Sequence, residues 1–506
     1  PAPARPRRDR GFCPGPRIML GHTARMAQPN GFYAYFTVQI FERFGFYSVQ
    51  YLLLLFAIER FAFDLVDASL LFSSYFSMIY ASTIVGGIAA DRYLGYRLAS
   101  IAGLSAMACG CLMLSLGSIP TTYLGLALLI TGNGLFKPCI TTLVGLLYGT
   151  DNRGRDVGFT IYYMGINIGA GAAALLSGFA AENFGYGPVF FACALAKCVA
   201  LAILANMDVS KTQDHGPSVK SPSGSRRKSV NPFYAVSVFV FAVMIAVLSL
   251  WHYALPGVFI LSAAVFCILY LSKECLSMDG HQRRNIVLML VVFGFSAVFW
   301  MAFAQDSDLV VSFFRDSLDR QAFGLTIPSS SFISLNTFFV IVGAPVVSWI
   351  FASSTSRRRL IEIARFSCGL LLMALAYFAL AHAAQLSIQD GAMRSAVWAI
   401  LFFALLSFGE LFISPIGLSM VSRLAPKNLA GFAMGMWFLM HAIGAYFGGV
   451  VTEMIYPAGE LAPDVALAAN RLAFDTFGYL CAGSGLLLLL GYLVLGRYGA
   501  DGDRAG

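Results

Sequence analysis

The sequence predicts an all-α polytopic membrane protein, in which two six-helix bundles flank two extra helices. Of its 506 residues, 58% are hydrophobic and only 12% are charged, whereas about a quarter of the residues in a soluble domain are charged. The chain also contains about fourteen mostly apolar windows of about 20 residues, each long enough to cross a bilayer as a helix. Short alternating segments, which are typical of membrane β-barrels, do not recur along the chain.

These windows define the predicted elements in chain order. They begin near residues 31, 68, 98, 121, 156, 187, 233, 255, 284, 328, 361, 393, 428 and 470. One stretch between them is rich in Ser, Pro, Lys and Arg, a composition typical of a flexible linker. The predicted parts are an N-terminal tail at 1–30, a six-helix bundle at 31–207, this linker at 208–232, two additional peripheral helices at 233–275, a second six-helix bundle at 284–496 and a C-terminal tail at 497–506.

The basic residues predict the orientation of the chain. Arg153 and Arg155, like several other Lys and Arg residues, lie in loops that follow even-numbered windows, while loops such as "DSDLVVSFFRDSLD" carry more acid. Lys and Arg are enriched in the cytoplasmic loops of membrane proteins. Both tails are therefore expected to be cytoplasmic.

Other classes of protein fit the sequence less well. The net charge of +8 comes from loops beside apolar windows, so a lipid bilayer rather than a nucleic acid is the expected partner. The histidines lack metal-ligand spacing, and we find no nucleophile with a base and no phosphate loop, so neither an enzyme nor a metal or cofactor site is expected. A sensor built on a transporter scaffold would be favoured by a large soluble domain, and the chain has only a short linker. No obligate protein partner is evident.

Three predicted helices carry polar stripes. A charge at the bilayer centre costs from about 2.5 to more than 10 kcal/mol, so such stripes must face protein or water and usually serve a pathway. The first half supplies two cations and the second half an anion, an arrangement that suits a zwitterion such as a short peptide. The stripes, at helical spacing, are Gln39, Glu42 and Arg43 in the first window, Asn133, Lys137 and Thr141 in the fourth, and Ser407, Glu410 and Ser414 in the tenth.

Glu42 and Arg43 are adjacent in sequence, which bears on their partners. Neighbouring residues point about 100° apart on a helix, so we expect each to find its partner on another helix. The alternative is that the two neutralise each other as a structural pair.

The turn "GGIAADRYLGYR" resembles the loop signature of the major facilitator superfamily, whose members have two six-helix halves around a central cavity. Asp91 is expected to cap the next element or to pair with Arg97, and Arg92 to hold the cytoplasmic face. A simple Gly-Asp turn between hydrophobic helices is the other interpretation.

Four further stretches narrow this resemblance. "ERFGFYS", "GNGLFKPCITTLVG", "GFTIYYMGINIGA" and "GELFISPIGLSMVSRLAPKNLAGFAMGMWFL" resemble signatures of the proton-dependent oligopeptide transporter (POT/PTR) family. The pattern is most similar to the bacterial di- and tripeptide permeases of that family. The resemblance implies a secondary active transporter that imports di- and tripeptides across the bacterial cytoplasmic (inner) membrane by alternating access, with protons as the coupling ion and no other cofactor.

The resemblance also implies roles for the polar residues. The cations of the first half would meet the peptide carboxylate, and the acid of the second half would meet the amine with help from two asparagines. Aromatic residues would line the cavity. The implied substrate-binding residues are Arg43, Tyr47, Lys137, Asn167, Asn336, Glu410 and Trp437.

Proton coupling is where the chain departs from the family pattern. Gln39 replaces the first carboxylate of the family's ExxER motif. The candidates for carrying protons are Glu42, Glu410 and His441, and Lys197 is a further unusual residue inside a predicted span. An alternative function therefore stays open, namely a permease or exporter of a modified peptide or another small organic ion, with weak or absent proton coupling.

Overall fold

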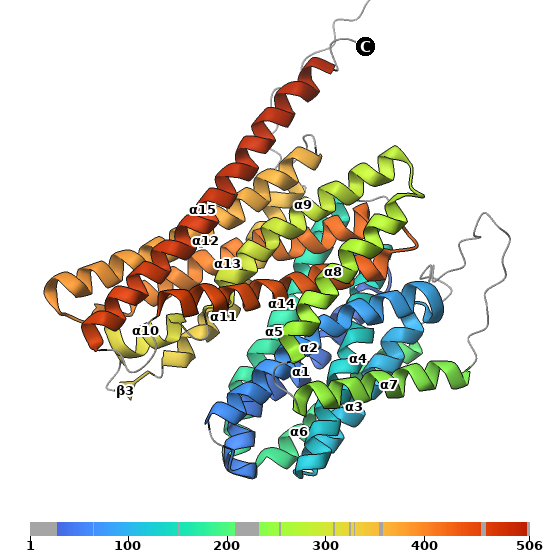
Figure 1. Cartoon of the computed structure of the whole chain (residues 1–506), viewed down its shortest axis with the longest axis horizontal. Helices are drawn as coiled ribbons and strands as arrows, with labels where there is room; N and C mark the ends of the chain where they lie inside the picture. The colour runs from blue at the N-terminus through green and yellow to red at the C-terminus, as the bar shows by residue number, and fades with distance from the viewer. Residues whose placement is uncertain are drawn as a thin grey trace, which may run out of the picture.

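The computed structural model is almost entirely helical (Figure 1). It describes residues 28–63, 65–149, 152–207, 232–251, 255–306, 309–322, 325–327, 329–353, 358–456 and 462–502. The predicted linker and most of the N-terminal tail lie outside these residues. The predicted bounds of the linker and of the two tails therefore stay predictions.

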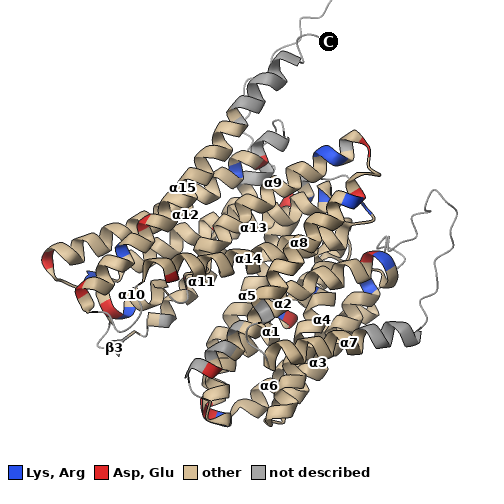
Figure 2. Cartoon of the chain, in the orientation of Figure 1, with Lys and Arg blue, Asp and Glu red and all other residues tan. Residues whose placement is uncertain are grey.

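Fourteen of the described helices have 20 residues or more, and each corresponds to one predicted window. Twelve of them are long and apolar enough in their described residues to cross a membrane. The largest difference in start is at the last helix, predicted from 470 and observed from Pro463. Figure 2 shows charged residues gathered near helix ends, with the middle of most helices free of them. These findings confirm the polytopic all-α fold class.

The helices fall into two bundles and an inserted pair. The first bundle contains α1 (Phe32–Phe61), α2 (Leu65–Ala89), α3 (Tyr96–Ser115), α4 (Ile119–Leu146), α5 (Asn152–Phe184) and α6 (Tyr186–Asn206), and a π-helical turn η1 (Ala90–Leu94) follows α2. The inserted pair is α7 (Pro232–Trp251) and α8 (Leu255–Cys275). The second bundle contains α9 (Gly280–Phe303), α11 (Ser334–Ser353), α12 (Arg358–Asp390), α13 (Val397–Leu424), α14 (Ala430–Ile455) and α15 (Pro463–Gly502).

The connection between α9 and α11 contains small elements that no sequence pattern predicted. They are α10 (Leu309–Ser317), β1 (Leu318–Asp319), β2 (Gln321–Ala322), β3 (Leu325–Thr326) and the 3-10 helix η3 (Ser329–Ile333). β1 pairs in parallel with β4 (Arg394–Ser395), and β2 pairs antiparallel with β3. These elements lie at one end of the helices, which we call the α10 end.

Small residues bring helices close together inside the first bundle. A Cβ atom added to Gly103 of α3 would lie 2.5 Å from the carbonyl oxygen of Gly132 of α4, and one added to Gly132 would lie 2.6 Å from that of Gly103. The same occurs between bundles, where a Cβ at Gly87 of α2 would lie 2.3 Å from the carbonyl oxygen of Gly431 of α14. Close backbone approach at small residues is the usual basis of helix packing in membranes.

The inserted helices lie at the periphery, and one of them contacts both bundles. Large apolar side chains such as Phe241 of α7 and Val258 of α8 are exposed at 57% and 60%, which agrees with a lipid-facing surface. α7 packs on α4 and α2, and the rings of Trp251 and Tyr123 lie 5.2 Å apart. α8 packs on α2 of the first bundle and on α14 of the second (Figure 1). The expected peripheral position therefore includes a link between the bundles.

Candidate substrate and coupling site

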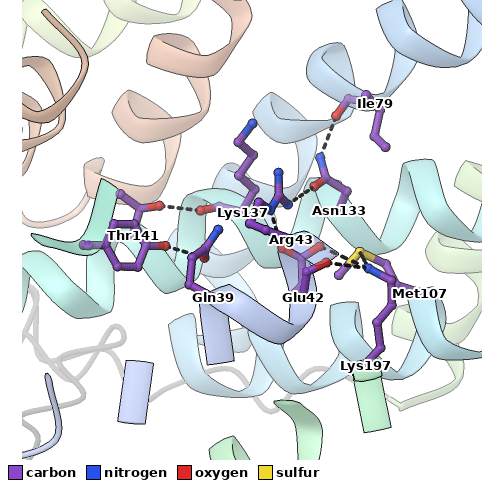
Figure 3. A network of polar contacts seen from close by, with 10 residues as sticks. Gln39, Glu42, Arg43, Ile79, Met107, Asn133, Lys137, Thr141 and Lys197 are labelled. Carbon is purple, nitrogen blue, oxygen red and sulfur yellow. Dashed lines mark hydrogen bonds and ion pairs between the residues drawn. The ribbon is translucent and has the colours of Figure 1, made fainter. Parts of the chain in front are cut away.

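The polar stripe of α1 lies buried inside the first bundle, as its helical spacing predicted. Gln39, Glu42 and Arg43 are only 2%, 0% and 1% exposed. Arg43 Nε donates to Glu42 Oε2 at 2.6 Å, and Arg43 Nη2 donates to Asn133 Oδ1 of α4 at 3.1 Å (Figure 3). The expectation of a partner on another helix is therefore confirmed for Arg43, and the alternative, in which Glu42 and Arg43 pair with each other, holds as well. Rotation of the long Arg43 side chain overcomes the angular separation of neighbours.

Lys197 of α6 is a second cation that contacts Glu42 (Figure 3). Its Nζ donates to Glu42 Oε1 at 3.2 Å and to the backbone oxygen of Glu42 at 3.3 Å. Lys197 is 0% exposed, so it does not extend toward the lipid headgroups. We call Glu42, Arg43, Asn133 and Lys197 the α1 cluster. The lone lysine inside an apolar window was the sequence signal for this contact, but nothing in the sequence identified its partner.

Gln39 lies one helical turn before Glu42 and has a partner of its own. Its Oε1 accepts a hydrogen bond from Tyr162 Oη of α5 at 2.6 Å. Both residues belong to the first bundle. The amide therefore occupies a neutral hydrogen-bonded position, where the resemblance led us to expect a carboxylate.

Lys137 of α4 lies among aromatic rings. Its Nζ is 4.3 Å from the ring centroid of Tyr80, 4.5 Å from that of Phe438 and 5.9 Å from that of Phe46. Phe438 belongs to α14, so this ammonium group lies where the two bundles meet. Within the described part of the chain it forms no ion pair. Cation–π contacts contribute about 0.5 to 2 kcal/mol each and leave the charge available to an anionic ligand.

Glu410 of α13 lies on the other side of the same interface. Asn336 Nδ2 of α11 donates to Glu410 Oε2 at 2.8 Å and to Ser407 Oγ at 3.1 Å. Tyr163 Oη of α5 donates to Glu410 Oε1 and so reaches across from the first bundle. We call Glu410, Asn336, Ser407 and Tyr163 the α13 cluster. All partners of Glu410 among the described residues are neutral. The sequence analysis did not predict Tyr163 as a site residue, although it lies in the motif "GFTIYYMGINIGA".

The remaining predicted substrate residues vary in their surroundings. Tyr47 is half-buried, and its ring stacks on Tyr51 at 5.8 Å. Asn167 Nδ2 donates to the backbone oxygen of Tyr163 at 3.2 Å. Trp437 is 1% exposed and packs so tightly on Gly417 that an added Cβ there would lie 2.0 Å from its ring. In this conformation Trp437 therefore packs in the protein interior, and its role in lining a cavity stays a prediction.

His441 of α14 lies close to Lys137 through shared aromatic neighbours. Its ring stacks on Trp300 of α9 at 3.6 Å and on Tyr80 of α2 at 5.5 Å. Its Nδ1 atom has no hydrogen-bond partner among the described residues. His441 thus lies at the junction of the two bundles with its Nδ1 atom buried.

Asp91 joins the bundles at the opposite end of the helices from α10, which we call the Asp91 end. Its Oδ1 accepts from the backbone N–H of Gly431 at 2.8 Å and its Oδ2 from that of Phe432 at 2.7 Å. A carboxylate here satisfies free N–H groups in the first turn of α14 and interacts favourably with the helix dipole. Tyr96 Oη donates to the same carboxylate at 2.8 Å. Burial raises the pKa of Asp91 to about 6, although these donors act to lower it.

Asp91 caps a helix, as predicted, but the helix is α14 and not the next element in the chain. It caps a helix of the other bundle, and it does not pair with Arg97. Arg97 Nη2 instead donates to carbonyl groups at the end of α6, including that of Ala205 at 2.9 Å. Arg92 lies in an exposed ion pair, in which Nη2 is 3.1 Å from Glu274 Oε1 of α8.

Further contacts join the bundles at the Asp91 end. Asp156 of α5 accepts from Ser419 Oγ of α13, and its Oδ2 lies 3.6 Å from Arg365 Nη1 of α12. Thr83 Oγ1 of α2 donates to the backbone oxygen of Gly435 of α14 at 3.1 Å. The two bundles are therefore held together at this end by polar contacts of several helices.

The described residues contain no group of three or more His, Cys, Asp or Glu able to hold a metal ion. The chemistry that the site offers is recognition of charge: ammonium and guanidinium groups in one bundle, and a carboxylate in the other.

The known proteins that resemble this chain are named as peptide transporters or permeases. The model described as the POT family matches residues 99–465. The chain is 28% identical over 486 residues to dipeptide and tripeptide permease A of Enterobacter sp. (strain 638), covering 94% of each. It is 30% identical over 462 residues to peptide transporter YePEPT of Yersinia enterocolitica subsp. palearctica serotype O:3 (strain YE-P4), covering 87% of this chain and 89% of that protein.

Two solved structures extend the likeness to the fold. A bacterial homologue of the human drug peptide transporters PepT1 and PepT2 has a TM-score of 0.69 and 25% identity, over 92% of this chain and 98% of that one. A mutant of peptide transporter POT in complex with alafosfalin has a TM-score of 0.69 and 26% identity, over 93% of this chain and 96% of that one.

Proposed function

We propose that this chain, which belongs to the POT family, is a secondary active transporter that imports di- and tripeptides across the bacterial cytoplasmic membrane. Its family consists of multi-pass membrane transporters of the major facilitator fold and not of enzymes. The observation that carries the proposal is the opposition of Lys137 and Glu410. They lie at the junction of the bundles, and among the described residues neither has a partner of opposite charge.

A short peptide complements this pair of charges. Its carboxylate would bind near Lys137 and Arg43, and its ammonium group near Glu410 with Asn336 beside it. A buried charge without a counter-charge raises the free energy of the empty site. Each charged terminus of a bound peptide supplies such a counter-charge and lowers that free energy. Recognition of the termini leaves the side chains of the peptide unspecified, and half-buried aromatic residues such as Tyr47 offer contact area to many of them.

Alternating access follows from where the bundles touch. The contacts of Asp91 and Asp156 close the Asp91 end in this conformation. The distribution of Lys and Arg supports a cytoplasmic location for this end and for both tails. We therefore assign the conformation as closed to the cytoplasm, and opening to the cytoplasm would break the cap that Asp91 places on α14.

Protons are the coupling ion that the family suggests, and this chain offers Glu42, Glu410 and His441 to carry them. Glu410 is bonded across the interface by Tyr163, so rocking of the bundles would change its surroundings. A second function remains a candidate because Gln39 replaces an acid of the family's motif and is hydrogen-bonded to Tyr162. That function is a permease or exporter of a modified peptide or another small organic ion, with weak or absent proton coupling.

Uptake of labelled dialanine into proteoliposomes tests the proposal and its alternative together. We expect uptake that is saturable and stimulated by an inward proton gradient. Saturable uptake without stimulation would support the uncoupled permease. Absence of both uptake and exchange in vesicles with correctly folded protein would contradict peptide transport.

A further inference from the structure

We propose that Lys197 is a positioning residue that keeps Glu42 ionised throughout the transport cycle, so that the α1 cluster binds substrate without carrying a proton. This inference rests on the proposed function. It removes Glu42 from the predicted proton carriers and assigns the proton-sensitive carboxylate to the second bundle, at Glu410.

The carboxylate of Glu42 contacts two cations at once. Its two carboxylate oxygens face different cations, with Arg43 Nε at 2.6 Å from Oε2 and Lys197 Nζ at 3.2 Å from Oε1 (Figure 3). All three side chains are 1% exposed or less. A proton on Glu42 would displace one of these contacts and leave two cations buried without a counter-charge. Since removing one partner of a buried ion pair is strongly unfavourable, the second cation makes protonation harder than Arg43 alone would.

The first bundle has room for the Lys197 side chain beside α1. A Cβ atom added to Gly45 of α1 would lie 3.2 Å from Lys197 Cε and 3.3 Å from the backbone oxygen of Cys193. The glycine therefore leaves a slot on α1 that the lysine stem fills. Lys197 Nζ also lies 3.9 Å from Met107 Sδ of α3. The ammonium group thus contacts both the carboxylate and the backbone oxygen of Glu42, with Met107 beside it.

Contacts within one bundle and contacts between the bundles respond differently to a change of conformation. Glu42, Arg43 and Lys197 lie on α1 and α6, which belong to the same bundle. When two bundles rock about a central site, contacts within one bundle persist and contacts between bundles change. Glu410 differs, because its bond from Tyr163 crosses the interface. Only the second carboxylate therefore has surroundings that alternate with the transport cycle, as a coupled proton site requires.

Among the described residues, no second carboxyl group faces Glu42. Gln39 has an amide that does not titrate, and its partner Tyr162 is a neutral donor. The charged and titratable groups facing Glu42 from its own and neighbouring helices are Arg43 and Tyr47 of α1, Tyr75 of α2, Cys111 of α3, Lys137 of α4, Tyr162 of α5, and Lys197 of α6. In this set the cations outnumber Glu42, the single acid that is charged near neutral pH.

The test compares wild type with Lys197→Met and Lys197→Arg in proteoliposomes. Counterflow of labelled dialanine is measured from about pH 5 to about pH 8, a range in which a released carboxylate or His441 could titrate. In Lys197→Met we expect the half-saturating concentration to fall about tenfold as the pH is lowered, because protonation of Glu42 then frees Arg43 for the peptide carboxylate. Wild type and Lys197→Arg should lack this transition. Lys273→Met, which removes an exposed lysine of α8, is the matched control.

A second measurement uses a near-isosteric change and does not depend on the folding of Lys197→Met. Gln39→Glu restores a carboxylate whose described partner is neutral, so protons moved per dialanine, followed with a pH-sensitive dye, should increase over wild type. An unchanged pH profile in Lys197→Met, or no increase in Gln39→Glu while counterflow persists, would overturn the inference alone. No counterflow in folded wild type would instead overturn the proposed function, and the inference with it.

Discussion

The α1 cluster, inside the first bundle, and the α13 cluster, at the junction of the bundles, hold their charges in opposite ways. In the α1 cluster, Glu42 is paired with two cations of its own bundle. In the α13 cluster, the donors to Glu410 among the described residues are neutral, and one of them comes from the other bundle. The first arrangement fixes a charge, and the second leaves a charge that depends on conformation and ligand. Under the proposed function, the α1 cluster contributes to binding of the peptide carboxylate, and the α13 cluster senses the conformation.

The largest expected effect comes from removing the charge of the α13 cluster. Glu410→Gln should lower dialanine uptake at least about 100-fold, since loss of one partner from a buried charge pair costs about 3 kcal/mol or more. Uptake is measured in proteoliposomes at matched protein density. Glu453→Gln, at an exposed position of α14, should transport normally. Normal uptake by Glu410→Gln would remove this residue from the site.

Removing the available cation of the first bundle should have the next largest effect. Lys137→Ala should lower uptake about 30-fold, because Arg43 still offers a cation to the peptide carboxylate while the aromatic walls lose their ammonium group. Lys427→Ala, at an exposed position, is the matched control in the same uptake assay. If the two variants transported equally well, the peptide carboxylate would have to bind elsewhere.

Two adjacent tyrosines sharpen the comparison without changing any charge. Tyr163→Phe removes a donor to the charged Glu410, and Tyr162→Phe removes a donor to the neutral Gln39. Hydrogen bonds to charged groups contribute about 1.5 to 3 kcal/mol and neutral ones about 1 kcal/mol. We expect about a tenfold loss of gradient-driven uptake in Tyr163→Phe and a loss severalfold smaller in Tyr162→Phe. The reverse order would mean that the hydrogen bond between Tyr162 and Gln39 matters more for coupling than the one between Tyr163 and Glu410.

The smallest expected effect concerns the closed Asp91 end. The pKa of Asp91 is about 6 in this closed conformation, against 3.8 ordinarily. A group that holds its proton more tightly when the end is closed favours closure as the pH falls through the range from about 6 to about 4. Spin labels at Leu98 and Lys427, both exposed, should report a closed fraction that rises severalfold in that range. Asp91→Asn should abolish this pH dependence, and its persistence in the variant would assign it to another group.

The fold could be predicted from the sequence because each helix must be apolar over the thickness of a bilayer. That requirement located all fourteen long helices, including the inserted pair. It could not locate α10 or the short strands, since elements outside the bilayer carry no such signal. It also could not tell that α8 joins the bundles through α2 and α14, because an apolar face toward lipid and one toward protein look alike.

For the candidate site, helical spacing could predict which residues point toward the protein interior, but not which residues they contact. Spacing placed Glu42, Arg43 and Lys137 toward the protein interior, and family resemblance gave them roles that stay predictions. It could not identify contacts that depend on how helices are arranged, such as Lys197 on Glu42. The partner of Asp91 is a further case, since Gly431 lies 340 residues further along the chain.

The most direct test of the central claim is recognition of both charged ends of a peptide. Counterflow of labelled dialanine is measured in the presence of unlabelled dialanine, its N-acetylated form or its C-terminal amide. The account predicts that only the zwitterion competes well, because Glu410 needs the ammonium group and Lys137 with Arg43 needs the carboxylate. Equal competition by both blocked peptides would contradict a site built on these two opposed charges.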